Sequence, residues 1–171
     1  MPPESPERRM PNLPFVAISF AIHLALGLWI GGTIFLGALA APSVFRAAPS
    51  RTSAGAIVGQ MVNGFARVKA LCMIVLVAAA WVRFRRWEMW HDWIAVRAGF
   101  IAAACVLESM GTWVIGPRIR GARGAIEEAG LDFDRETDHP LRIRFRRLHG
   151  MAMGLQSLAA LAAAGALFMF F

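Results

Sequence analysis

Four long apolar stretches, separated by short polar segments, occupy most of the 171-residue chain. They cover roughly residues 13–45, 57–82, 93–116 and 148–171. A helix needs about 20 apolar residues to cross a hydrocarbon core about 30 Å thick, and each stretch reaches that length. The pattern therefore predicts an all-α integral membrane protein, folded as a four-helix bundle with up-down topology.

The polar interruptions define the expected limits of these helices. The four predicted spans are residues 14–41, 57–83, 93–116 and 145–170. Pro42 is expected to end the first helix, and Pro117 the third, because proline lacks an N–H donor and its ring clashes with the preceding turn.

The remaining segments are polar. Residues 1–12 are charged and rich in proline, so we expect a disordered or surface-bound segment ahead of one transmembrane domain over residues 13–171. The longest predicted loop covers residues 118–144, with a brief amphipathic helix near residues 122–129.

Few polar side chains interrupt the apolar stretches, and their spacing is informative. Gln60, Asn63 and Arg67 are three and four residues apart, so they share one face of the second helix, which we expect to look at protein or water. Glu108 lies in the third helix. An ionisable group near the middle of a membrane helix is a candidate functional residue. The expected partners of Glu108 are Lys69, Arg67 and His149.

Glycine pairs at four-residue spacing occur in the first and fourth helices. Gly27 and Gly31 form one pair, and Gly150 and Gly154 form the other. Small residues at this spacing let two helix backbones approach closely. We therefore expect the first helix to contact the fourth through one or both pairs.

Composition narrows the class of protein further. The chain is 57% hydrophobic and carries a formal net charge of +7. Its arginines lie between the apolar stretches, at the depth of lipid head groups, which argues against a nucleic-acid partner. The two cysteines, Cys72 and Cys105, lie inside apolar stretches and do not form a secreted disulfide framework.

The distribution of basic residues predicts an orientation. Twelve Lys and Arg residues lie in or near the loops after the first and third helices, against six on the opposite side. The positive-inside rule then places residues 118–144 in the cytoplasm. We expect a multi-pass protein of a bacterial inner membrane.

Several short motifs occur in a characteristic order along the chain. The first helix contains His23 and Trp29-Ile30-Gly31, with Phe45-Arg46 after it; Pro117-Arg118 follows the third helix. The segment Phe145-Arg-Arg-Leu-His149-Gly150 opens the fourth.

This ordered set resembles domain-of-unknown-function family 4149, which includes the transmembrane-protein-205-like proteins, and is similar, more weakly, to copper-resistance D-type membrane proteins. The chain differs from the family pattern at Gln156, where an asparagine is usual, and at Ala66-Arg67. The resemblance implies a four-helix fold and a membrane location, and it implies no activity.

Two kinds of cofactor site can be considered from side-chain chemistry. His23 and His149 are candidate haem ligands, but counting residues along the two helices separates them by about 20 Å along the membrane normal, too far for one haem iron. A haem bound through one of them remains open. Soft donors for Cu(I) lie on three helices, without a metal-binding spacing: Cys72, Met73, Cys105, Met110, His149, Met151 and Met153. No metal site is predicted.

The sequence contains no soluble domain and no complete set of catalytic residues. The leading prediction is therefore a non-enzymatic subunit or scaffold that packs against a larger membrane complex or against a second copy. The alternatives are a haem- or metal-binding membrane protein, and a proton or solute conduit built around Glu108.

Overall fold

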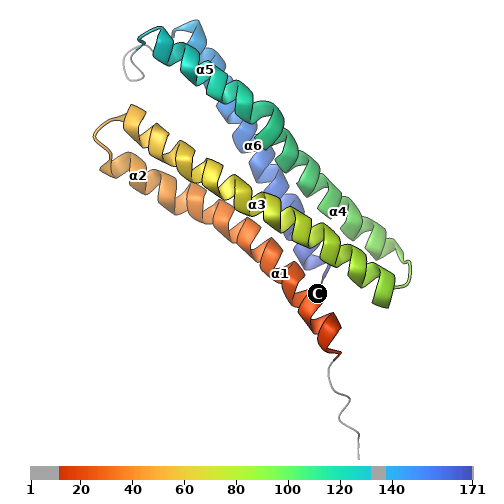
Figure 1. The fold of residues 1–171 in the computed structure, drawn as a ribbon. Helices are drawn as coiled ribbons and strands as arrows, with labels where there is room; N and C mark the ends of the chain where they lie inside the picture. The colour runs from red at the N-terminus through yellow and green to blue at the C-terminus, as the bar shows by residue number, and fades with distance from the viewer. Residues whose placement is uncertain (1–11, 132–137, 171) are drawn as a thin grey trace, which may run out of the picture.

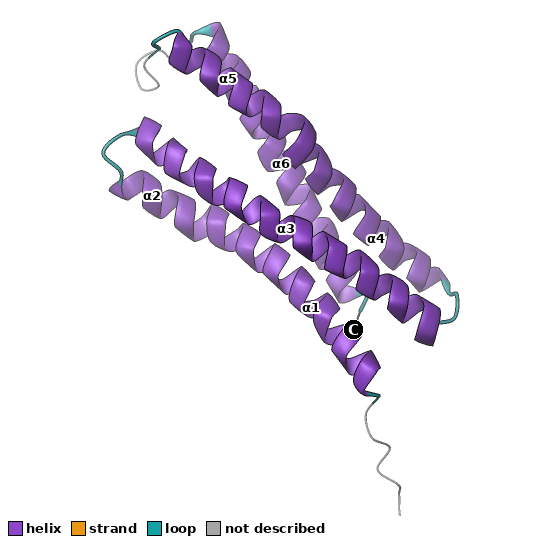
Figure 2. Cartoon of the chain, viewed as in Figure 1, coloured by secondary structure: helices purple, strands orange, loops and turns teal. Residues whose placement is uncertain are grey.

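The computed structural model describes residues 12–131 and 138–170. Four long helices run up, down, up and down, joined by short connections (Figure 1, Figure 2). Each is long and apolar enough to cross a membrane, and no strand occurs in the described ranges. The predicted all-α membrane fold is confirmed. The disordered or surface-bound segment predicted over residues 1–12 lies outside the described residues, except for Asn12.

Two of the four long helices contain a π-helical segment. The first consists of α1 (Leu13–Ile34), η1 (Phe35–Ala40) and α2 (Ala41–Ala47). The third consists of α4 (Asp92–Ser109), η2 (Met110–Ile115) and α5 (Gly116–Glu128). The second is α3 (Arg51–Trp87) and the fourth is α6 (Pro140–Phe168).

The expected helix ends at Pro42 and Pro117 were wrong. Each proline lies in the first turn after a π-helical segment, and the helix continues beyond it. A widened π turn takes the place of the intrahelical hydrogen bond that proline cannot donate, and it moves the preceding carbonyl away from the ring. The π-type bonds reach the residue just before each proline: the Ala41 amide donates to the Leu36 carbonyl, and the Gly116 amide donates to the Gly111 carbonyl.

Helix extension also shortens the predicted loops. The second helix begins at Arg51 and not near residue 57 as predicted. The Ser50 side chain caps it by accepting a hydrogen bond from the Ser53 amide over 3.2 Å. The fourth helix begins at Pro140, where the His139 ring accepts from the Leu141 amide. The brief helix predicted near residues 122–129 is the end of α5.

Each helix has one inward stripe of side chains. The buried residues of α1 are Ile22, Ala25, Leu26 and Trp29, spaced at three and four residues, and alanines with the same spacing form the stripe of α6. Large apolar side chains such as Phe20, Leu71 and Leu161 are exposed on the outside of the bundle, as lipid contact requires.

The helices associate as two pairs. α1 packs along α3, α4 packs along α6, and α1 also contacts α6 (Figure 1). By contrast, α3 and α4 make few direct contacts although they follow each other in sequence. Their buried side chains nevertheless share one core cluster, to which α3 contributes Cys72 and Leu76 and α4 contributes Ile101 and Ala104.

The predicted glycine contacts are not the ones that hold the pairs together. Gly27, Gly31, Gly150 and Gly154 are exposed, and a Cβ added at any of them would meet no neighbouring atom within 4 Å. This prediction was wrong because these glycines lie on the outer faces of α1 and α6.

Two other glycines sit at the close approaches. A Cβ on Gly32 of α1 would overlap the Phe65 ring of α3. One on Gly165 of α6 would lie 2.7 Å from the Phe100 ring of α4. Both approaches pair a glycine with an aromatic ring, within the two helix pairs.

Candidate functional site: an intramembrane ion pair and an interfacial arginine cluster

Charged residues occupy positions on the inward stripes of α3 and α4. On α3 the buried positions include Lys69, Cys72 and Leu76. On α4 they are Arg97, Ile101, Ala104 and Glu108. The stripe spacing that buries apolar residues elsewhere in the bundle thus directs Lys69, Arg97 and Glu108 into the protein.

The first charged group in the interior is an ion pair between α3 and α4. Lys69 Nζ lies 2.5 Å from Glu108 Oε1, and the two side chains are only 3% and 5% exposed. Thr112 of η2 donates a hydrogen bond to the same oxygen over 3.1 Å. A buried pair of this kind strongly penalises loss of either partner, because the remaining charge would be uncompensated.

The pair lies deep in the bilayer. At 1.5 Å per residue, Glu108 is about 16 Å from Arg97 and about 15 Å from Arg118 along its helix, which are the nearest charged residues on either side. Those distances place the carboxylate near the middle of a hydrocarbon core about 30 Å thick.

Two polar atoms near this depth have no protein partner. Glu108 Oε2 and Trp29 Nε1 are buried without a hydrogen-bond partner among the described residues. Lys69, in contrast, has a second contact: its Nζ lies 5.5 Å from the centroid of the Phe65 ring. That separation is within the range of a cation–π interaction.

The other predicted partners of Glu108 lie elsewhere. Arg67 is exposed on α3, and His149 is exposed on α6, where its ring stacks on Phe145 with 6.0 Å between centroids. The structure therefore assembles Lys69 and Glu108 from the predicted polar cluster, and it leaves Arg67 and His149 outside it.

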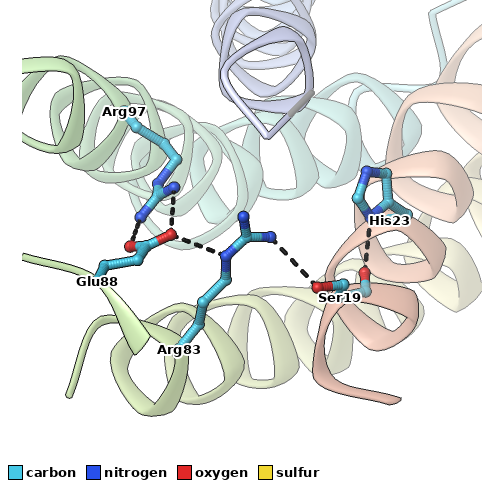
Figure 3. A network of polar contacts seen from close by, with 5 residues as sticks. All are labelled: Ser19, His23, Arg83, Glu88 and Arg97. Atoms are coloured by element: carbon cyan, nitrogen blue, oxygen red, sulfur yellow. Dashed lines mark hydrogen bonds and ion pairs between the residues drawn. The ribbon is translucent and has the colours of Figure 1, made fainter. Parts of the chain in front are cut away.

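The second charged group lies at the end of the bundle where α3 turns into α4. Glu88, in this turn, accepts from Arg83 Nε over 2.8 Å and from Arg97 Nη1 over 2.9 Å, and Arg97 Nη2 bonds its other oxygen (Figure 3). Arg83 Nη1 also donates to the Ser19 hydroxyl of α1 over 3.3 Å. The cluster thereby connects α1, α3 and α4.

Aromatic rings cover this arginine cluster. The Arg97 guanidinium lies 4.4 Å from the centroid of the Phe170 ring, and the Arg83 guanidinium lies 5.2 Å from it. Arg83 also contacts Phe15 at 5.0 Å. Phe170 is buried, so the segment just after α6 is held between two cations.

The electrostatics of Glu88 follow from these contacts. Burial by itself raises the pKa of its carboxyl, but the hydrogen bonds and positive charges of Arg97 and Arg83 outweigh burial and lower the pKa below its usual range. Glu88 is therefore ionised at neutral pH. This carboxylate neutralises one of the two arginine charges that lie against it.

Sequence reasoning missed this cluster. The signal was present in Arg97, which lies inside an apolar stretch on the same helical face as Glu108. An arginine at such a position requires an acidic partner, and Glu88 is the nearest carboxylate in the chain after Asp92.

The two histidines considered as haem ligands, His23 and His149, lie far apart in the fold. His23 Nδ1 donates to the Ser19 carbonyl over 2.6 Å (Figure 3). Its ring centroid lies 6.3 Å from that of Phe170. His149 lies about 30 Å from Phe170 along α6, counted at 1.5 Å per residue. Among the described residues no group of three His, Cys, Asp or Glu side chains is arranged to hold a metal ion.

Comparison with known proteins gives a family. A profile for a domain of unknown function, DUF4149, matches residues 24–128, which is more than half of the chain. The chain belongs to this family. The predicted DUF4149 resemblance is confirmed, and the matched region contains both members of the intramembrane pair and the Arg83–Glu88–Arg97 cluster. Searches of curated proteins and of solved structures returned no match.

Proposed function

We propose that this DUF4149 protein is a non-enzymatic subunit of a membrane complex, and that it packs against a partner helix through the outer face of α3. The observation that carries the proposal is the direction of the polar stripe Gln60–Asn63–Arg67. We expected this stripe to face protein or water. In the isolated chain all three side chains are exposed on the outside of the bundle.

The depth of the stripe makes its exposure informative. Arg67 lies about 24 Å along α3 from Arg83, and Asn63 about 30 Å, at 1.5 Å per residue. If Arg83 marks one boundary of a hydrocarbon core about 30 Å thick, Arg67 lies within the core, near its opposite boundary. Asn63 lies at that opposite boundary. Polar groups that face outward at this depth are stabilised by hydrogen bonds from a neighbouring helix.

The exposed glycines support the same proposal. Gly27 and Gly31 on α1, and Gly150 and Gly154 on α6, leave open surface where a partner backbone can approach closely. Their spacing is that of small-residue helix contacts, and none of the described helices of this chain occupies this surface. The partner is either another membrane protein or a second copy of the chain.

Orientation and location are part of the proposal. Basic residues are concentrated at the end of the bundle that holds α2, α5 and the start of α6, and the imbalance persists when Lys69 is set aside as an interior residue. The positive-inside rule places that end in the cytoplasm, and the location is a bacterial inner membrane.

Site-specific photo-crosslinking in intact membranes tests the packing proposal. A photoreactive residue at Asn63 should give one protein adduct of discrete mass, and Arg67→Leu in the same chain should lower its yield at least several-fold. The matched control is Val106, which is 56% exposed on the apolar face of α4 and should give lipid adducts. Twice the chain mass of 18.7 kDa would identify a second copy.

The proposal fails if Asn63 yields only lipid adducts. It also fails if Asn63 and Val106 capture the same proteins with equal yield, because contact would then not be specific to the polar stripe.

A further inference from the structure

We propose that Glu108 is an intramembrane proton-binding site, with Lys69 as the cation that balances its charge. The starting observation is the unequal use of the two carboxylate oxygens. Oε1 accepts from Lys69 and Thr112, whereas Oε2 is buried with no partner among the described residues. A buried oxygen without a hydrogen-bond donor is unfavourable, and a proton bound at Oε2 would satisfy it.

The surroundings of Lys69 allow the protonated state to exist. When a proton adds to Oε2, the carboxylate becomes a neutral carboxylic acid, an O–H bond forms, and the ammonium of Lys69 loses its counter-ion. The Phe65 ring at 5.5 Å remains as a cation–π partner for that ammonium. Phe65 is held in place by its approach to Gly32 of α1, so this second partner is built into the packing of the bundle.

Few other groups compete for the proton. Between residues 13 and 45 the only titratable side chain is His23, and none occurs between residues 150 and 170. The packed helices therefore present His23 from α1, Lys69 and Cys72 from α3, Cys105 and Glu108 from α4, and nothing titratable from this part of α6. Among the residues that the structure describes, Glu108 is the sole carboxylate in the membrane interior.

A series of hydrogen-bonded groups leads from the Glu88 end of the bundle toward the Lys69–Glu108 pair. They extend from Glu88 through Arg83 to Ser19 and His23 (Figure 3). In the antiparallel pair formed by α1 and α3, Gly32 lies against Phe65, so Trp29, three residues earlier, is level with Lys69. His23 is about 9 Å further toward the Glu88 end, between the two charged groups.

Local helix geometry adds an independent indication. The π-helical segment η2 begins at Met110, two residues after Glu108, and it carries Thr112. Single-turn π segments inside α-helices are frequent at functional sites because they redirect side chains from the regular helical positions. Here the segment holds the Thr112 hydroxyl against the carboxylate.

Infrared titration of the protein in lipid vesicles tests the proposal. Lowering the pH should produce the C=O band of a protonated carboxylic acid, with the intensity of one carboxyl more in the wild type than in Glu108→Gln. Glu127→Gln is the matched control, because Glu127 is an exposed carboxylate paired with Arg123 on α5, outside the intramembrane site. This control should lose only the band of the exposed Glu127 carboxyl, and it should retain the band of Glu108 in full.

A second variant keeps the result interpretable. Glu108→Gln alone leaves the Lys69 charge without a counter-ion and can impair folding. The double variant Lys69→Met/Glu108→Gln removes both charges and should fold, and it should lack the same band. The proposal is overturned if the wild type and whichever variant folds give identical pH-difference spectra.

Discussion

At the level of single residues, the charged side chains of the interior decide what this protein can do. Arg97 and Glu108 lie on one helical face three turns apart, but they meet different partners. Arg97 pairs with Glu88 at the end of the bundle, and Glu108 pairs with Lys69 near the middle. One pair is close to water, and the other is enclosed by apolar helices, so the same chemistry has different consequences.

The lowered pKa of Glu88 predicts how stability responds to acid. The native pKa is below that of the unfolded chain, about 4.3 for glutamate, so the ionised carboxylate stabilises the fold above that pH. This stabilisation is lost as the pH falls through the native pKa. Glu88→Gln should lower the thermal midpoint at neutral pH and weaken its dependence on pH below about 5.

The measurement is thermal unfolding in detergent between neutral and acidic pH. Glu127→Gln is the control, because an exposed i,i+4 pair contributes about 0–1 kcal/mol. Parallel curves for the wild type and Glu88→Gln across the acidic range would show that Glu88 does not couple stability to pH.

At the level of the helix, the pattern of apolar residues predicted the four long helices well, but sequence motifs predicted the contacts between the helices poorly. Apolar length identified all four long helices, because the hydrocarbon thickness sets a minimum that the sequence must meet. Proline chemistry suggested helix ends at Pro42 and Pro117, where the chain instead forms π turns and continues. The four-residue glycine spacing was correctly seen but wrongly assigned to contacts within the bundle.

The reason is that a motif read from sequence does not indicate which face of a helix is inward. Gly31 and Gly32 are adjacent, yet Gly31 is exposed and Gly32 lies against Phe65. Likewise, the sequence named three partners for Glu108 because Lys69, Arg67 and His149 all fall near one depth. Lys69 is the partner because α3 is rotated so that this side chain faces inward. That rotation is set by the packing of all the buried residues of α3.

Alanine substitution at the glycines tests this assignment of faces. Gly32→Ala and Gly165→Ala should destabilise the protein by about 1–3 kcal/mol, because each new methyl group displaces an aromatic ring of the neighbouring helix. Gly31→Ala and Gly154→Ala are matched controls with open space around the new Cβ, and they should cost little.

Unfolding in detergent, followed by circular dichroism, gives the comparison. Equal losses at Gly31 and Gly32 would mean that the close approach of Phe65 to α1 does not contribute to stability.

At the level of the whole molecule, the up-down arrangement makes a topological prediction. Single cysteines placed in residues 46–52 and 118–128, in a variant without Cys72 and Cys105, should react with an impermeant thiol reagent from the same side of the membrane. Cysteines placed in residues 88–91 should react only from the other side. The physical reason is that each long helix crosses the bilayer once.

Right-side-out and inverted vesicles provide the two directions of labelling. If residues 46–52 and 118–128 react from opposite sides, the four-span topology is wrong. If both react only from the periplasmic side, the span count stands and the proposed orientation is reversed.

The association of the helices into two pairs has a consequence for biogenesis. α1 pairs with α3, the next long helix in the chain, and α4 pairs with α6 in the same way. Each pair is a helical hairpin whose contacts are local in sequence, so it can form soon after it leaves the ribosome. The first hairpin can thus be complete while the second is still being synthesised. Joining the two hairpins then brings Glu108 to Lys69, which buries both charges only when the bundle closes.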